Sequence, residues 1–381
     1  MAQKLLHFGK RGEGMRLVQE AYETAEAYEF MYLLIELAAI FHHEHSFYEI
    51  DPEKANFYAD KIEEYQDIYS LNKKVERLYY QTQISSGDAD HAAIIQKGIQ
   101  KIKAINGKTT KYFIYLTVLE VQYGFKIGDY PRAEKKCAEG ISFFQGLASS
   151  YSSYIYSLSK SQGLAQMALT NYADADQSFE QASMYCPPKS FNDYLLRYYR
   201  IINALHAGHY NQAYIWYRQN RNCRFEKLRL HFAILGAYLC FLSHTGLLVL
   251  ERRFRLGKYL NETIRSQASQ KVNNINVLIA ELLVHLVRDR GKFIDRVEAA
   301  EHYSYRHLKD PGLRRAKWFL KIICRLPAAN FHPDALRRRT QKYFDLLEKH
   351  PLALGERFEV EIVPFDILLG LVLKQLKRKT A

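Results

Sequence analysis

The sequence predicts an all-α protein, a solenoid of about nine helix-turn-helix repeats followed by a C-terminal helix. Two observations support this fold class. Apolar residues recur at three- and four-residue spacing along the chain, and no stretch keeps the alternation of a β-strand. Short turns also recur at intervals of 38 to 45 residues, and their marker residues stand at positions 87, 128, 170, 208, 246 and 291.

The helical periodicity is clear in the first half of the chain. One apolar stripe comprises Met31, Leu34, Ile35, Ala38, Ile40 and Phe41, and a later one comprises Tyr112, Tyr115, Leu116, Leu119, Tyr123 and Phe125. Each stripe covers one side of a helix, so each helix needs a neighbour that buries it. The sequence therefore predicts hairpins in which a second amphipathic helix follows each turn.

Each turn contains a small or glycine residue, and in four of the six an aromatic residue stands close behind it. Glycine lets the backbone turn sharply, and the aromatic ring packs the turn against the neighbouring helix. The six turns are Gly87-Asp88-Ala89, Gly128-Asp129-Tyr130, Thr170-Asn171-Tyr172, Gly208-His209-Tyr210, Thr245-Gly246-Leu247 and Gly291-Lys292-Phe293.

Proline marks the start of three second helices. Pro52, Pro131 and Pro333 suit the first turn of a helix, because the N–H that proline lacks would have no partner there. Asp51, which precedes Pro52, is a candidate N-cap. These starts extend the repeat from about residue 50 to about residue 330.

The C-terminal part departs from this periodicity. Residues 351–363 contain a proline, a glycine and a brief alternation of Val, Ile and Phe, which predicts a loop or one short strand. A final helix is predicted from about residue 364 to about residue 378. The predicted division is therefore a solenoid over 1–350 and a loop with a capping helix over 351–381.

The clearest repeat lies between Tyr156 and Pro188, where Gly163 is predicted to let two helices approach closely. The second helices of three successive repeats carry Tyr130, Ala133, Cys137 and Gly140, then Tyr172, Ala175, Phe179 and Ala182, then Tyr210, Ala213 and Tyr217. This spacing of small and large side chains resembles the tetratricopeptide repeat, whose helical hairpins of about 34 residues stack on one another. The ending of the chain, Glu361 to Leu369, is similar to that of bacterial helical-repeat proteins.

The resemblance covers about a third of the chain and implies a right-handed superhelix. Two features differ from the family pattern: the period is longer, and Glu120, Gln162 and Arg200 occupy first-helix positions that usually hold Leu. The family binds extended peptides along the concave face formed by its first helices. In the register of the matched turns, the resemblance places Tyr115, Gln122, Lys126, Lys160, Met167, Tyr198, Ile202 and His206 in this groove.

Charge is distributed unevenly along the chain. The net charge is +13, but residues 1–190 hold 20 Lys and Arg against 24 Asp and Glu, whereas residues 191–381 hold 34 against 17. If the charges of the basic half align, they favour an acidic partner, either a protein or a nucleic acid. If they do not align, they form a simple solvated surface. The candidate polyanion-binding residues are Arg221, Arg224, Lys227, Arg229, Arg252, Arg253, Arg255, Lys258, Arg314, Arg315, Arg337, Arg338 and Arg339.

No catalytic pattern is visible. The sequence has no GxSxG, P-loop, HExxH or GxGxxG motif, and Asp174 and Asp176 are spaced so that they point to different helix faces. The densest group of metal-ligating residue types, His42 to His45, is better interpreted as a solvated helix end. We therefore predict no enzymatic activity, no catalytic residue, no metal and no cofactor.

The N-terminal sequence, the length of the apolar stretches and the cysteines predict the compartment and the membrane association of the protein. Residues 1–14 lack the apolar run of a secretory signal, and the apolar stretches elsewhere are too short to cross a bilayer. The five cysteines form no CxxC pair and read as reduced thiols. These features predict a cytoplasmic protein that does not bind membranes.

The predicted function is a non-enzymatic scaffold that holds a protein or peptide, acidic in character, on a concave surface. The first alternative is nucleic-acid or other polyanion binding through the basic C-terminal half, which would show a steep dependence on salt. The second alternative is a sensor or regulatory domain of a longer protein. The sequence leaves the oligomeric state open.

Overall fold

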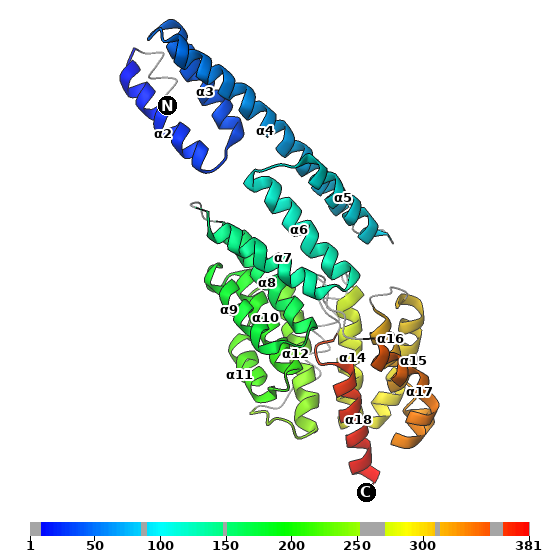
Figure 1. Cartoon of the computed structure of the whole chain (residues 1–381). Helices are drawn as coiled ribbons and strands as arrows, with labels where there is room; N and C mark the ends of the chain where they lie inside the picture. The colour runs from blue at the N-terminus through cyan, green and yellow to red at the C-terminus, as the bar shows by residue number, and fades with distance from the viewer. Residues whose placement is uncertain are drawn as a thin grey trace. The chain divides into compact units, whose positions relative to one another are not determined.

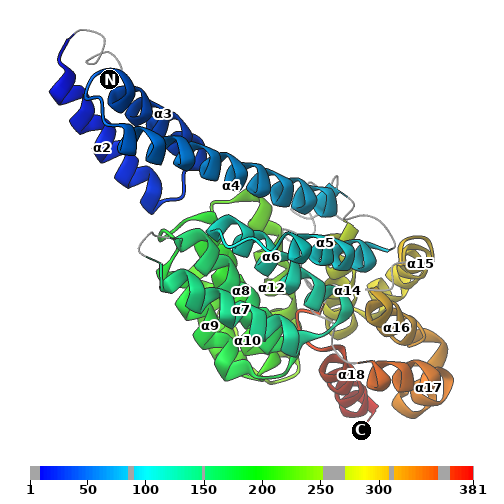
Figure 2. The same cartoon turned by 45° about the horizontal axis from the view of Figure 1, so that its top comes forward.

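The computed structural model describes residues 9–84, 90–147, 151–251, 271–308, 313–350 and 361–380, and every regular element in these ranges is helical (Figure 1, Figure 2). The predicted all-α class is confirmed for this part of the chain. The final helix, α18 (Phe365–Thr380), begins within a residue of its predicted start.

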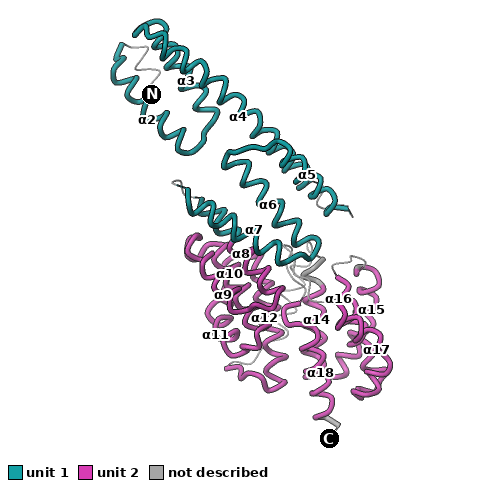
Figure 3. The backbone as a smooth tube through the Cα atoms, viewed as in Figure 1, with its two compact units in different colours: residues 1–158 teal, residues 159–381 magenta. Residues whose placement is uncertain are grey.

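The chain divides into two compact units, residues 1–158 and residues 159–381, and the division falls inside α8 (Ser152–Ala168) (Figure 3). The predicted boundary at residue 350 stays a prediction, because residues 351–360 lie outside the described ranges. The other helices of unit 1 are α2 (Arg11–Ala27), α3 (Met31–Phe47), α4 (Pro52–Ile84), α5 (His91–Ile105), α6 (Thr110–Ile127) and α7 (Tyr130–Gln145). Those of unit 2 are α9 (Tyr172–Met184), α10 (Phe191–His206), α11 (Tyr210–Asn220), α12 (Glu226–His244), α14 (Lys271–Arg288), α15 (Arg290–His307), α16 (Arg314–Ile323), the 3₁₀ turn η2 (Pro327–Ala329), α17 (Pro333–Lys349) and α18.

Within each unit, helices that follow one another in the chain pack side by side. In unit 1 this holds for every successive pair from α2 to α7, and α4 also contacts α6. In unit 2 it holds from α9 to α12 and from α14 to α18, and contacts that skip one helix join α10 to α12 and α16 to α18. Contacts between nearest and next-nearest helices are typical of stacked hairpins.

The predicted turns are largely where the sequence placed them. Gly128, Gly208 and Gly246 adopt φ values of +74°, +77° and +80°, and Thr170 reaches +63°. Only glycine adopts this left-handed region without strain, which explains why the repeats end their first helices on it. Gly291 is different, because it lies inside the first turn of α15, which Asp289 caps through the N–H of Lys292. The turn at 87–89 lies outside the described residues.

All three proline starts are confirmed. Pro52 and Pro333 are the first residues of α4 and α17, and Pro131 is the second residue of α7. Asp51 accepts a hydrogen bond from the N–H of Lys54 at 3.1 Å, and Asp129 does the same for Arg132 at 3.2 Å. The aspartates therefore satisfy N–H groups that the helix itself leaves without partners.

Two departures from the tetratricopeptide pattern have a physical reason. Glu120 is buried in α6, where Lys103 of α5 lies 2.6 Å and Lys136 of α7 3.4 Å from its two carboxylate oxygens. Arg200 of α10 makes a two-pronged pair with Asp176 of α9, at 2.7 and 2.9 Å, and lies over the ring of Trp216 of α11. Charged pairs between neighbouring helices thus stand where the family usually packs leucine.

The close approach predicted at Gly163 is also confirmed, and it yields a test. A Cβ at Gly163 would lie 2.6 Å from the ring of Phe179, which is fully buried. We expect Gly163→Ala to lower the free energy of unfolding by about 1 to 3 kcal/mol, because the core has no room for the methyl group. Urea unfolding followed by circular dichroism measures the change.

Gly370→Ala is the matched control. Gly370 lies in α18 with no atom within 4 Å of an added Cβ, so the same substitution should stabilise the chain by about 0.5 to 1 kcal/mol. Equal effects at the two positions would contradict the close approach at Gly163.

Candidate functional site

The predicted groove positions of unit 2 are mostly buried. Met167, Tyr198, Ile202 and His206 are 0 to 4% exposed, so they do not line an accessible groove. Lys160 is half-buried and engaged in a contact of its own. The expectation that these first-helix side chains face a peptide is therefore corrected, because other parts of the same unit cover them.

Two segments provide this cover. The ring of Tyr198 packs against His231 and Phe232 of α12, with ring centroids 5.3 and 6.1 Å apart. Nε2 of His206 lies 2.8 Å from the carbonyl oxygen of Glu361, just before α18. Ile362, Val363 and Phe365 have no exposed surface, so the segment that follows Glu361 is itself packed within unit 2. It therefore lies at the end of α10, where part of a peptide was expected.

Glu361 holds this segment in place. Its carboxylate binds the guanidinium of Arg315 through both oxygens, with one contact at 3.1 Å, and accepts the N–H of Phe365 at 3.0 Å. Arg315 also donates to Asp366 at 2.7 Å and to the carbonyl oxygen of Leu347 at 2.7 Å. Burial raises the pKa of Glu361, and the ion pair with Arg315 opposes that rise. Arg315 was a candidate for polyanion binding, but its side chain is 11% exposed and fully paired, so we correct that assignment.

The groove candidates of unit 1 face the neighbouring helix α4. Tyr115 stacks on Tyr79 with ring centroids 4.7 Å apart, and its hydroxyl donates to Glu76 at 3.3 Å. The side-chain oxygen of Gln122 accepts a hydrogen bond from Gln83 at 2.8 Å. Lys126 is exposed near the end of α6. Tyr115 and Gln122 therefore join two helices and are half-buried, whereas Lys126 is exposed.

A pocket that the sequence did not predict lies beside these residues in unit 1. It has a volume of about 370 Å³ and lies between the start of α3, the middle of α4 and the start of α6. Its lining comprises Glu29, Phe30, Met31, Tyr32, Leu33, Tyr69, Asn72, Lys73 and Lys111. Phe30, Tyr32 and Leu33 are 50, 61 and 47% exposed, so the pocket presents aromatic and aliphatic surface to solvent.

Hydrogen bonds and ion pairs connect the polar residues around this pocket. Glu29 accepts the N–H of Thr110 at 2.9 Å and its hydroxyl at 3.0 Å, at the N-terminus of α6, where the helix dipole favours a negative charge. Glu76 contacts both Lys73 at 3.0 Å and Lys111 at 3.7 Å. Burial alone would raise the pKa of Glu76, but the two ammonium groups hold it below its ordinary value. Two lysines thus share one carboxylate at the pocket edge.

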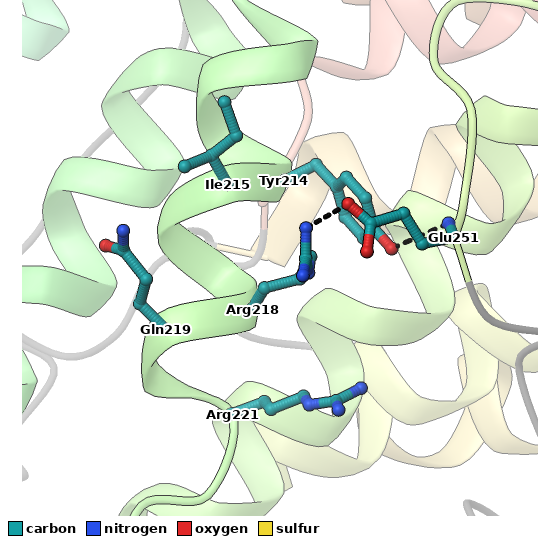
Figure 4. A pocket seen from close by; sticks show the side chains of 6 residues that line it. All are labelled: Tyr214, Ile215, Arg218, Gln219, Arg221 and Glu251. Atoms are coloured by element: carbon teal, nitrogen blue, oxygen red, sulfur yellow. Dashed lines mark hydrogen bonds and ion pairs between the residues drawn. The ribbon is translucent and has the colours of Figure 1, made fainter.

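A second pocket lies in unit 2, at the outer side of α11. It has a volume of about 290 Å³ and is lined by Tyr214, Ile215, Arg218, Gln219, Arg221 and Glu251 (Figure 4). Arg218 pairs with Glu251, and the N–H of Glu251 donates to the hydroxyl of Tyr214 at 3.0 Å. Among the described residues, no salt bridge pairs the remaining charged lining residue, Arg221.

The other predicted basic residues fall in separate places within unit 2. Arg221, Arg224, Lys227 and Arg229 are exposed around the turn between α11 and α12, and Arg224 donates to the carbonyl oxygen of Lys189. Arg314 and Arg337 to Arg339 are exposed on α16 and α17. In both views α9 and α10 lie on one side of unit 2 and α15 to α17 on the other, with α14 between them (Figure 1, Figure 2). Arg252, Arg253, Arg255 and Lys258 lie outside the described residues.

The histidine cluster of α3 is occupied by structural contacts. Glu44 binds Arg11 through both carboxylate oxygens at 2.8 to 3.0 Å, and Nδ1 of His42 lies 2.9 Å from the carbonyl oxygen of Ala55. Within the described ranges, no three His, Cys, Asp or Glu side chains are grouped as a metal site would need. A search of the same residues finds no helix that is both long and apolar enough to cross a membrane.

Comparison with known proteins does not assign the chain to a family. No protein-family model matches the chain, and neither a curated protein nor a solved structure shows significant similarity to it. The class that the structure defines is an all-helical protein of consecutively packed helices, with an open aromatic pocket in unit 1 and a covered helix face in unit 2.

Sequence reasoning missed the pocket, although a signal was present. Phe30, Tyr32 and Leu33 lie outside the stripe formed by Met31, Leu34, Ala38 and Phe41. A helix that needs only one buried side has no structural use for apolar residues on the other sides. This surplus of apolar residues at the start of α3 marks an exposed patch.

The burial of Arg315 and Glu361 leads to a stability prediction. We expect Arg315→Leu to lower the free energy of unfolding by about 3 to 5 kcal/mol, because it leaves a buried carboxylate without its cation. Adding Glu361→Gln should recover part of this loss, since the double variant has no buried charge at the site. Urea unfolding of the single and double variants measures both effects.

Arg314→Leu is the control for that comparison. Arg314 is the exposed neighbour of Arg315, so its replacement should change stability by no more than about 0.5 kcal/mol. If Arg315→Leu is as stable as Arg314→Leu, the pair does not anchor the C-terminal segment.

The buried contact of His206 with Glu361 predicts that the stability of the folded chain falls in acid. Burial lowers the pKa of His206 to about 4, so the folded chain keeps this imidazole neutral while the unfolded chain protonates it near its ordinary pKa. Its contribution to stability is therefore complete above about pH 6.5 and is lost as the pH falls towards 4. Between about pH 7 and about pH 4.5, the wild type should lose roughly 2 to 3 kcal/mol more than His206→Gln. Urea unfolding at the two pH values tests this, and parallel losses in both proteins would contradict it.

Proposed function

We propose that this chain is a protein-binding scaffold whose unit 1 captures a peptide by its apolar side chain in the pocket lined by Phe30, Tyr32 and Tyr69. The proposal rests on the distribution of exposed apolar residues along the chain. Of the 17 large hydrophobic residues that are exposed in the described chain, 11 lie between residues 28 and 84. Three of these 11, Phe30, Tyr32 and Leu33, line the pocket. Exposed apolar residues that lie together are typical of an interaction site.

The pocket suits one bulky side chain. Tyr32 and Tyr69 lie with ring centroids 6.5 Å apart, and Phe30 stacks on Tyr28 at 5.6 Å. A volume of about 370 Å³ admits a Phe, Leu or Trp side chain with part of its backbone. Aromatic residues in such a pocket supply most of the affinity of a peptide complex, because they exclude water over a large area.

The rim favours an acidic residue next to that anchor. Lys73 and Lys111 share Glu76, and the charge of Glu29 is compensated by the N-terminus of α6. A carboxylate of the ligand could therefore approach the two lysines without meeting an uncompensated negative charge. We propose a peptide in which an aromatic or aliphatic residue stands beside Asp or Glu.

This placement of the site differs from the groove of the tetratricopeptide family. The resemblance to that family, the right-handed superhelix of about nine repeats and the lack of catalysis are parts of the same proposal. A cytoplasmic location is supported by the five cysteines, which are all buried and free. The bacterial origin suggested by the ending of the chain is a proposal of the same kind.

A phage-displayed library of random peptides, panned against the intact chain, tests the site. We expect the selected peptides to share an apolar residue next to an acidic one. Tyr32→Ala should weaken them by about 10- to 30-fold in calorimetric titration, since it removes an aromatic wall of the pocket.

Tyr305→Ala is the matched control, because Tyr305 of α15 is 82% exposed and lies in unit 2. It should leave the peptide affinities unchanged. Peptides that bind Tyr32→Ala as tightly as the wild type would contradict the proposal. So would sedimentation that shows a dimer of the wild type and a monomer of Tyr32→Ala, since a second copy of the chain would then fill the pocket.

A further inference from the structure

The hairpin formed by α16 and α17 concentrates the positive charge of the chain. Between residues 313 and 350 there are ten Lys and Arg and three Asp and Glu, and residues 313–333 contain no carboxylate at all. Since the whole chain has a net charge of +13, this short segment holds more than half of the excess. Solubility does not require charge of one sign on one hairpin.

All the charges of α16 except that of Arg315 lie on its outer side. Arg314, Lys317 and Lys321 are spaced three and four residues apart on α16, so they form one row, and Arg325 is exposed in the turn directly after the helix. The opposite side, with Phe319, Leu320, Ile322 and Ile323, is fully buried. Trp318 stands in the same outward sector and is half-buried beside His350, with ring centroids 4.8 Å apart.

A second row runs along the adjacent flank of α17. Arg338, Arg339 and Lys342 are exposed there. Nζ of Lys321 lies 3.2 Å from the hydroxyl of Tyr343 and 5.1 Å from its ring centroid, and Nζ of Lys342 lies 5.3 Å from the same centroid. Tyr343 therefore joins the two rows into one cationic surface that also carries aromatic rings.

Within the described residues, no carboxylate pairs with the exposed cations of this hairpin. Every salt bridge that the hairpin makes within the described residues goes through Arg315, to Glu361 and Asp366. The exposed cations repel one another at helical spacing, where like charges destabilise a helix. An external polyanion would remove this repulsion and release its own counterions on binding.

We propose that the outer face of the α16–α17 hairpin binds single-stranded nucleic acid. The two rows of Lys and Arg contact the phosphates of the strand, and Trp318 and Tyr343 stack on its bases. Cations interleaved with aromatic rings can bind single strands of any sequence, because every nucleotide offers a phosphate and a flat base. This activity is separate from the peptide pocket and does not depend on it.

Two other polyanionic partners fit the surface less well. An anionic membrane usually needs an apolar wedge to insert, but none of the large exposed hydrophobic residues in the described chain lies on α16 or α17. An acidic peptide usually needs a groove, but both pockets described above lie on other helices. The stacking rings favour a strand with bases over either.

The test uses the full chain with Trp216→Phe, which leaves Trp318 as the one tryptophan. The probe is a fluorescein-labelled oligouridylate of about 16 nucleotides, a length that fills one binding site. We expect binding in fluorescence anisotropy at about 50 mM salt and a steep loss of affinity by about 200 mM, with a slope of about −0.7 per phosphate contacted. Unlabelled oligouridylate should quench the fluorescence of Trp318.

The decisive variant is Lys317→Ala/Lys321→Ala/Arg325→Ala. It should weaken binding at least about tenfold, make the salt slope shallower by about 2 and abolish the quenching. The control is Lys97→Ala/Lys101→Ala/Lys108→Ala, which removes three exposed charges from α5 and the turn after it and should bind like the parent. Circular dichroism verifies that both variants fold.

Three results would overturn the proposal. The first is no binding of the oligouridylate at low salt. The second is an equal loss in the two triple variants, which would indicate attraction by net charge alone. The third is binding to phosphatidylserine vesicles or to polyglutamate that the oligouridylate does not displace.

Discussion

The constraint behind this structure is that a helix in such an array buries its apolar side mainly against its neighbours in the chain. α4 packs on α3, α5 and α6, and α16 packs on α15, α17 and α18. No single centre collects the apolar residues, so the core is spread along the array. Whether a further side of a helix is exposed depends on whether a segment from elsewhere in its unit lies against it. In unit 2 the residues before α18 reach the end of α10 at His206.

Apolar faces that look alike do not specify which helix should pack on which. Charged pairs at the helix contacts supply this information, and two of their carboxylates, Glu120 and Glu281, are buried. Glu120 is paired with lysines of the helices before and after it, Arg200 with Asp176, and Arg296 with the buried Glu281 at 2.7 Å. A hairpin that shifted along its neighbour would leave one of these charges buried and unpaired, which costs more than the pair contributes when formed. We infer that these pairs fix the register of the array.

The sequence predicted the local structure well because local rules determine it. The left-handed turns at Gly128 and Gly208, the proline starts and the close approach at Gly163 all depend on residues near one another in the chain. The sequence did not predict the burial of Tyr198 and His206. Tyr198 is covered by α12, and His206 by Glu361, which is 155 residues away from it in the chain. A register within a repeat shows which side of a helix a residue occupies. It does not show whether a later segment crosses that side.

Both candidate surfaces are places where the sequence supplies more than the fold uses. The fold of α3 needs Met31, Leu34 and Ala38 on one side, yet Phe30, Tyr32 and Leu33 add apolar surface on another. The fold of α16 needs one apolar side and any polar residues opposite, yet every charged residue on that opposite side is a cation. Exposed aromatic rings invite aggregation, and rows of like charge repel, so both features oppose solubility or stability. A feature that costs the folded chain something, and that the packing of the helices does not require, is best explained by a partner outside the chain.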